Sequence, residues 1–207
     1  MPYFIPESKS SRQYFFTGLI LACVVLLSGC VSVPPRPKNT NNACSIFSQY
    51  PQWYKDAKAA EKRWGVPVST QLAVMNQESS FIGTAKPPRQ KLLWVLPWKR
   101  PSTSYGYAQA LHSTWKDYQR NTGNQGVNRD SFAASTDFIS WYLRSIHLQT
   151  GVPMTNVYGL YLAYHDGPNG YLRGTYRHKA WLINVSKRVQ YQAQRYENQL
   201  KYCVNKL

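Results

Sequence analysis

Acidic side chains are scarce in this 207-residue chain, which has 9 aspartate and glutamate residues against 25 lysine and arginine residues. Between Glu61 and Asp117 the only carboxylate is Glu78. The formal net charge of +16 favours an anionic partner, and nucleic acid, anionic lipid and a polyanionic cell wall all qualify. With 43% hydrophobic and 16% charged residues, the composition is that of a globular protein and excludes a disordered tail.

Long apolar runs are also missing. The longest, FFTGLILACVVLL at 15–27, is too short to span a bilayer. Because Lys9 and Arg12 precede this run and small residues follow it, residues 1–29 are predicted to be a secretory signal. LSGC at 27–30 resembles the lipobox of bacterial lipoproteins, which implies cleavage before Cys30 and lipid attachment to it. An ordinary signal peptide is the alternative.

Several acyl chains on Cys30 would anchor the protein stably to a membrane. The resemblance to lipoproteins also implies an outer-membrane, periplasm-facing location, because Val31 stands where an aspartate typically retains such proteins in the inner membrane. Removal of residues 1–29 leaves 23 basic against 8 acidic residues, a charge of about +15. An exported protein meets little nucleic acid, so the expected anionic partner is the cell wall.

Cysteine is rare, with four residues in the chain. Cys23 leaves with the signal and Cys30 carries the lipid, so Cys44 and Cys203 remain. In an oxidising periplasm this pair should form a disulfide, which would stabilise the fold by about 4 to 5 kcal/mol in the chain-entropy model. Two cysteines offer too few ligands for a metal site, and we expect no metal or other cofactor.

The chain has no convincing alternation of apolar and polar residues, so the expected fold is mainly α, with at most one small hairpin between 85 and 104. Residues 30–43 are rich in proline and asparagine and are predicted to be an extended tether, followed by one domain over 44–207. Ser69 and Asp130 are the expected N-caps of two helices. The apolar periods predict helices over about 50–64, 69–79, 108–121, 130–146, 155–164 and 178–203.

Glu78 is expected near the C-terminal end of its helix. The helix macrodipole disfavours negative charge there, and Val74 and Met75 lie on the preceding turn, so the pKa of Glu78 should be raised. A carboxyl group that stays protonated near neutral pH can act as a general acid. The alternative is a surface glutamate that is ion-paired with one of the many lysines or arginines.

Three blocks of sequence resemble those of family 1 lytic transglycosylases, relatives of goose-type lysozyme that cleave the glycan strands of peptidoglycan. They are ESSF at 78–81, YGYAQAL at 105–111 and LAYHDGPNGY at 162–171. Each block alone is weak evidence, but three in the family's order are much stronger. The resemblance covers roughly residues 46–200 and implies a lysozyme-like fold.

The resemblance also implies roles for individual residues. Glu78 would be the single catalytic acid and base, Gln109 would contact the sugar, and Tyr164 would hydrogen-bond Glu78 and hold its carboxyl group. Tyr105 and Tyr171 are weaker candidates for binding or positioning. The implied reaction cleaves after an N-acetylmuramyl unit and uses that unit's own C6 hydroxyl, which gives 1,6-anhydro ends without water.

Two features depart from the family's pattern. His165 replaces an asparagine and is followed by Asp166, which could activate water in a hydrolase or bind locally at its helix end. The extra segment 87–101 carries Trp94 and Trp98, and it could be a cleft wall, a membrane-touching loop or a hairpin packed on the domain. A non-catalytic wall-binding lipoprotein and a structural subunit of an envelope-crossing machine are rival functions.

Overall fold

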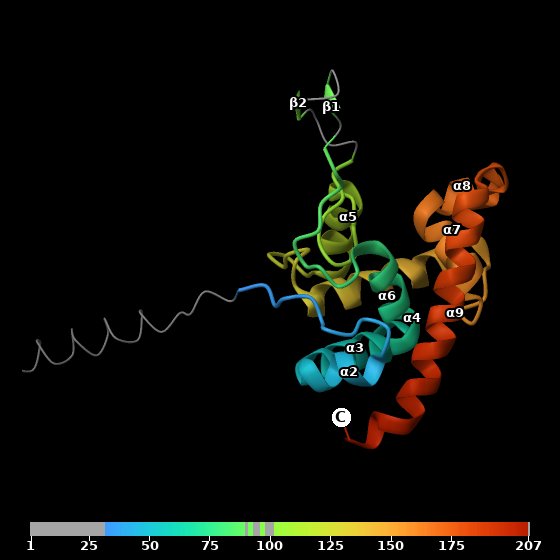
Figure 1. Cartoon of the computed structure of the whole chain (residues 1–207). Helices are drawn as coiled ribbons and strands as arrows, with labels where there is room; N and C mark the ends of the chain where they lie inside the picture. The colour runs from blue at the N-terminus through green and yellow to red at the C-terminus, as the bar shows by residue number, and fades with distance from the viewer. Residues whose placement is uncertain (1–31, 90, 93–95, 98–101, 207) are drawn as a thin grey trace, which may run out of the picture. The chain divides into compact units, whose positions relative to one another are not determined.

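The computed structural model describes residues 32–89, 91–92, 96–97 and 102–206, and Val33–Leu207 form one compact unit (Figure 1). The predicted signal, the predicted lipidation site Cys30, Trp94 and Trp98 lie outside the described residues. The unit is mainly helical, which confirms the expected fold class. Its longer helices are α3 (Pro51–Trp64), α4 (Val68–Ser79), α5 (His112–Thr122), α6 (Phe132–Thr150), α7 (Val157–Asp166) and α9 (Ala180–Cys203). Its shorter elements are α2 (Ala43–Gln49), β1 (Lys91–Leu92), β2 (Leu96–Pro97), α8 (Pro168–Leu172), η1 (Thr175–His178) and η2 (Val204–Lys206).

Helix α4 is the most enclosed helix of the site region. Every residue from Val68 to Met75 is buried, and α9 and α6 both pack against α4 (Figure 1). Buried side chains interdigitate at high packing density, so a helix enclosed by its neighbours cannot shift without displacing them. The burial of α4 therefore holds its C-terminal end, and with it Glu78, at a fixed place in the fold.

The predicted helices are present, but two of the predicted N-cap residues are wrong. Ser69 is buried inside the first turn of α4, and the residue that precedes this helix is Pro67, whose φ of −56° already suits a helix start. Helix α6 is capped by Ser131, which accepts a hydrogen bond from the Ala134 N–H at 3.3 Å. Asp130 instead accepts a hydrogen bond from the Tyr105 hydroxyl at 3.0 Å.

Helix α5 begins at His112, later than the expected residue 108. Tyr105 and Ala110 form an isolated antiparallel bridge, which closes a tight turn over the residues between them. The turn needs left-handed backbone at Gly106 (φ 81°) and Gln109 (φ 46°), and this conformation cannot continue into a helix. The expected hairpin between 85 and 104 is confirmed by β1 and β2, which pair antiparallel.

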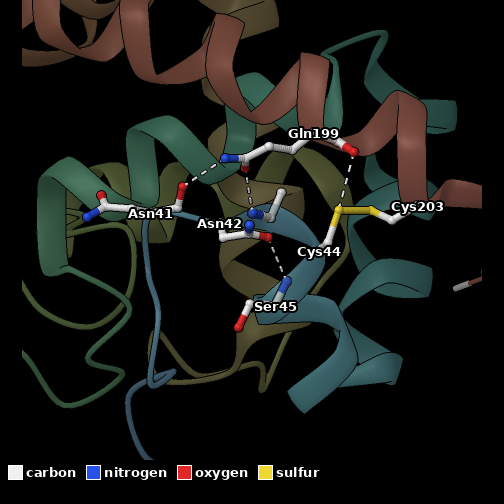
Figure 2. The surroundings of a disulfide bond; sticks show 7 residues. Asn41, Asn42, Cys44, Ser45, Gln199 and Cys203 are labelled. Atoms are coloured by element: carbon white, nitrogen blue, oxygen red, sulfur yellow. Dashed lines mark hydrogen bonds between the residues drawn. A yellow bond between two sulfur atoms is a disulfide. The ribbon is translucent and has the colours of Figure 1, made fainter.

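The segment before α2 differs from a free tether. The Tyr50 hydroxyl donates a hydrogen bond to the Pro35 carbonyl at 2.7 Å, and the buried Tyr196 hydroxyl donates to the Thr40 carbonyl. Gln199 accepts from the Ala43 N–H at 2.8 Å and donates to the Asn41 carbonyl at 3.1 Å (Figure 2). These partners satisfy backbone groups that proline-rich chain cannot pair within itself, so the compact unit begins at Val33 instead of Cys44.

The predicted disulfide between Cys44 and Cys203 is present (Figure 2). It joins α2 to the last turn of α9, with the two Cα atoms 6.0 Å apart and a sequence separation of 159. The bond therefore closes a loop that contains almost the whole compact unit.

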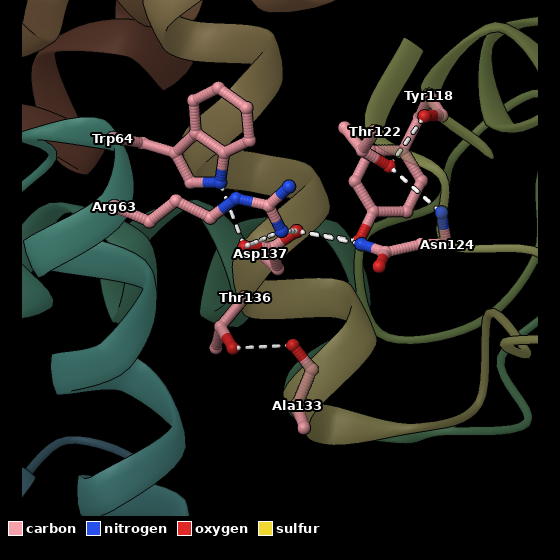
Figure 3. A network of polar contacts seen from close by, with 8 residues as sticks. All are labelled: Arg63, Trp64, Tyr118, Thr122, Asn124, Ala133, Thr136 and Asp137. Atoms are coloured by element: carbon pink, nitrogen blue, oxygen red, sulfur yellow. Dashed lines mark hydrogen bonds and ion pairs between the residues drawn. The ribbon is translucent and has the colours of Figure 1, made fainter. Parts of the chain in front are cut away.

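A carboxylate network ties three helices together on the side of α6. Asp137 accepts hydrogen bonds from Trp64 Nε1 (2.7 Å), the Tyr118 hydroxyl (2.7 Å) and Asn124 Nδ2 (3.1 Å), and it forms an ion pair with Arg63 at 3.2 Å (Figure 3). With four donors on one carboxylate, the position of α6 against α3 and α5 is set by directional bonds as well as by packing.

No helix in the part of the chain that the structure describes is both long and apolar enough to cross a lipid bilayer.

Candidate active site

A cavity of about 390 Å³ opens beside the C-terminal end of α4. This volume lies within the usual range of small-molecule sites. Its wall combines hydroxyl, amide and aromatic groups, which suit the hydroxyl-rich edges and apolar faces of a sugar. The lining residues are Glu78, Ser102, Ser104, Gln109, Ala110, Leu111, Thr114, Phe138, Tyr142, Tyr164 and His165.

Glu78 is the acidic group of this cavity. It lies one residue before the end of α4, is half-buried, and forms no ion pair with any lysine or arginine that the structure describes. Of the described residues that line the cavity, none other is aspartate or glutamate. The arrangement differs from the ion-paired surface glutamate that the sequence left open as an alternative.

Backbone strain is concentrated around Glu78. Ser80, Phe81 and Gln109 have φ values of 50°, 62° and 46°, and they are the non-glycine residues with positive φ in the described parts of the chain. Left-handed backbone is unfavourable for such residues and persists only where the surroundings enforce it. Phe81 is fully buried and stacks on Trp53 with ring centroids 6.3 Å apart, so packing holds the turn that follows Glu78.

The electrostatic environment favours the protonated form of Glu78. Burial raises the pKa of Glu78 to about 7, while the hydrogen bond from Tyr161 lowers it. The predicted direction of the shift is therefore confirmed, with burial as its main cause. A carboxyl group with this pKa is protonated in about half of the molecules at neutral pH, so it can both donate and accept a proton there.

The phenol that holds Glu78 is Tyr161, and the expectation for Tyr164 is wrong. The Tyr161 hydroxyl donates to Glu78 Oε1 at 2.8 Å, whereas the Tyr164 hydroxyl donates to the Ala108 carbonyl at 2.8 Å. The two tyrosines lie one turn apart on α7 with stacked rings, centroids 6.2 Å apart. Sequence spacing could not decide between them because both face the same side of the helix.

Gln109 lines the cavity but uses its amide within the protein. Its Nε2 donates to the carbonyls of Ala85 (3.0 Å) and Gly106 (2.9 Å), and its Oε1 accepts from Ser104 Oγ at 3.2 Å. Both amide hydrogens are thus engaged, and Gln109 braces the cavity wall. Sugar contact through its remaining acceptor capacity stays a prediction.

Tyr105 and Tyr171 do not line the cavity. The Tyr105 hydroxyl is bonded to Asp130, and the Arg129 guanidinium lies 5.2 Å from the Tyr105 ring centroid. Tyr171 stacks on Tyr176 with centroids 5.3 Å apart. Both tyrosines support the loops around the site, and direct contact with substrate is not indicated by their positions.

The Asp166 side chain bonds to neighbouring residues at the end of α7. Its side chain is 4% exposed, forms an ion pair with Lys179 and accepts a hydrogen bond from Thr175. Burial raises the pKa of Asp166, but these two partners outweigh burial and keep it below the usual value. His165 does reach the cavity and packs edge to face against Trp181, with centroids 4.9 Å apart.

A larger cavity, of about 800 Å³, lies between α3, the start of α4 and α9. Its two carboxylates are ion-paired at the surface, Glu61 with Lys58 and Glu197 with Lys201. Both carboxylates of this cavity therefore have a lysine partner, whereas Glu78 in the smaller cavity has no cationic partner among the described residues. In the described parts of the chain, no three histidine, cysteine, aspartate or glutamate residues come together as a metal site.

Comparison with known proteins agrees with this geometry. A family model described as "Transglycosylase SLT domain" matches residues 18–203. No curated protein matches the chain. The match covers nearly all of the compact unit, including the turn that follows Glu78, the loop that carries Gln109, and α7. The chain therefore belongs to the transglycosylase SLT domain family, whose lytic transglycosylases act on peptidoglycan.

Proposed function

We propose that this protein cleaves the β-1,4 bond between N-acetylmuramic acid and N-acetylglucosamine, with Glu78 as the single acid and base. The observation that carries the proposal is a half-buried carboxyl group with a pKa of about 7 that lines a sugar-sized cavity. Most glycosidases use two carboxylates, one as acid and one as base or nucleophile. The absence of a second one among the described lining residues favours a reaction in which the substrate supplies the nucleophile.

In the proposed reaction, Glu78 first donates its proton to the glycosidic oxygen, and the bond from C1 of the muramyl unit to that oxygen breaks. The acetamido group of the same sugar stabilises the resulting cation. The Glu78 carboxylate then takes the proton of the C6 hydroxyl, and O6 bonds to C1 to close a 1,6-anhydro ring. Glu78 ends protonated and no water is consumed. Attack within one ring replaces a bimolecular encounter, which supplies much of the rate.

The arrangement around Asp166 weighs against hydrolysis as the alternative. A base for water needs an accessible lone pair near the reacting carbon. The Asp166 oxygens are instead occupied by Lys179 and Thr175. A purely non-catalytic wall binder has no evident use for a half-buried acid without an ion-pair partner, because burying such a group costs stability.

We further propose that the enzyme works at the outer membrane, facing the periplasm, with lipid on Cys30. The support is the LSGC sequence and the composition of residues 1–29. The excess of basic residues would then hold the domain near anionic wall polymers.

Digestion of purified sacculi tests the reaction. The soluble muropeptides, analysed by mass spectrometry, should carry 1,6-anhydro-muramyl ends, which are lighter by one water than reducing ends. Reducing ends would show hydrolysis instead. Intact sacculi after incubation with the folded wild-type protein would contradict an enzymatic role and favour a non-catalytic wall-binding protein.

The pH profile distinguishes the two tyrosines of α7. Cleavage needs protonated Glu78, so the rate should fall as the pH rises through about 7. Because the Tyr161 hydrogen bond lowers the pKa of Glu78, the Tyr161→Phe variant should move this alkaline limb to higher pH. We also expect its kcat to fall by about tenfold, since the carboxyl group loses a positioning bond.

Tyr164→Phe is the matched control for Tyr161→Phe. It removes one hydroxyl from the same face of α7, but that hydroxyl bonds the Ala108 carbonyl. Its alkaline limb should stay within experimental error of wild type. Equal shifts in the two variants would contradict the assignment of Tyr161 as the partner of Glu78.

A further inference from the structure

Trp181 is exposed where a buried position would be expected for so large an apolar side chain. It is the second residue of α9 and is 54% exposed. Tryptophan is highly buried on average, and its ring offers a large apolar face on which a ligand ring can stack. The ring is also in direct contact with the site already described, because it packs against His165, which lines the Glu78 cavity.

The backbone that carries this pair is fixed by Asp166. Its ion pair with Lys179 and its hydrogen bond from Thr175 join the end of α7 to η1 and the start of α9. Thr175 also donates to the Gly170 carbonyl at 3.1 Å. The pair of His165 and Trp181 therefore lies on a preorganised support, which lowers the conformational entropy lost when a ligand binds.

The charge around Trp181 complements an anionic polymer. Residues 172–181, LRGTYRHKAW, contain no acidic residue. Arg173, Arg177 and His178 are exposed, and Lys179 is the one cation of this segment that is committed to Asp166. An aromatic face with cationic neighbours suits a glycan strand that carries carboxylates on its peptide stems.

We propose that Trp181, supported by His165, forms a further binding position for the glycan strand, next to the sugar held at Glu78. The apolar face of one additional sugar unit stacks on the indole, and Arg173 and Arg177 face the stem carboxylates. This inference rests on the proposed function, since it takes the cavity's ligand to be peptidoglycan. It gives roles to His165, which departs from the family's pattern, and to Asp166, which follows it: His165 supports the stacking ring and Asp166 positions the segment.

The test measures binding and turnover separately. In the Glu78→Gln background, binding of the full chain to purified sacculi is followed by sedimentation at physiological salt. Trp181→Ala should weaken this binding by about tenfold, and Trp181→Phe should restore most of it because the ring is retained. With Glu78 present, Trp181→Ala should raise KM for sacculi by about the same factor and leave kcat nearly unchanged.

Tyr191→Ala is the matched control. Tyr191 is 63% exposed on the same helix, about 15 Å further along at 1.5 Å per residue, and it does not line the cavity. Its removal should change neither binding nor KM. Neither substitution alters the net charge, so nonspecific attraction to the wall is the same in both variants.

Separate outcomes test the binding position at Trp181 and the proposed reaction at Glu78. If Trp181→Ala and Tyr191→Ala bind sacculi equally well, the binding position is refuted, whatever the products of digestion are. If wild type releases no anhydro-muropeptides but Trp181→Ala still binds less tightly than Tyr191→Ala, the binding position stands and the reaction is refuted. Thermal unfolding of each variant identifies any loss of fold, and a folded Trp181→Phe variant then supplies the comparison with wild type.

Discussion

Glu78→Gln leaves sacculi undigested. We expect the rate of muropeptide release to fall by at least about 10³-fold, because one group supplies both proton transfers and the amide can perform neither. The amide has nearly the shape of the carboxyl group, and its oxygen can still accept the Tyr161 hydrogen bond. Release of muropeptides by the purified variant, measured against wild type at the same pH, checks this prediction.

The same substitution should stabilise the fold at high pH. Folding raises the pKa of Glu78 from 4.5 to about 7, so the folded state carries a penalty for the ionised group. The penalty is absent below pH 4.5, where both states are protonated, grows between pH 4.5 and 7, and is constant above. Glu78→Gln removes it, so the variant should gain up to about 3 kcal/mol in free energy of unfolding at pH 8 and nothing at pH 4.

Glu197→Gln is the control for loss of a carboxylate. Glu197 lies at the surface and forms an exposed ion pair with Lys201 at 3.6 Å. Such pairs contribute little, so activity and stability should both stay close to wild type. An active Glu78→Gln variant, or one that is less stable than wild type at pH 8, would contradict the assignment of Glu78 as a half-buried proton donor.

Much of the fold could be predicted because helical periods are local. Leu182, Val189, Ala193 and Tyr196 recur on one face of α9 and are all buried. Helix starts were less predictable, since Ser69 and Asp130 have suitable side chains but Pro67 and Ser131 precede the helices. The docking of residues 33–42 depends on distant partners such as Tyr196 and Gln199, which no local pattern reveals.

The carboxyl group that lines the cavity could be predicted, but its hydrogen-bond partner could not. Glu78 stands out because other carboxylates are missing around it, and this signal is in the sequence. The choice between Tyr161 and Tyr164 depends on the rotation of α7 against α4 and on the competing Ala108 carbonyl. Both are tertiary features. Nothing in the sequence indicates that Trp181 is exposed, because an aromatic residue on an apolar helix face is normally part of the core.

Gly106→Ala should unfold the protein or leave it marginally stable. Gly106 has a φ of 81°, and a Cβ atom at this position would lie 2.0 Å from the Arg129 carbonyl oxygen. The neighbouring backbone cannot retreat, because the Gly106 N–H bonds the Ala85 carbonyl at 3.0 Å and the Tyr107 N–H bonds the Arg129 carbonyl at 3.3 Å. We expect a loss of more than about 4 kcal/mol in free energy of unfolding, measured by urea denaturation.

The Gly126→Ala variant separates the cost of left-handed backbone strain from the cost of the contact with Arg129. Gly126 has a φ of 79°, almost the same as Gly106, but a Cβ atom there meets nothing within 4 Å. The control therefore reports the left-handed strain alone, for which we expect about 1 to 2 kcal/mol. The additional loss of stability at Gly106 measures the contact with Arg129. This contact places the loop that carries Gln109 against the start of α6. Equal losses at the two glycines would show that this loop is held less tightly than its hydrogen bonds indicate, and the cavity wall would then have to be regarded as adjustable.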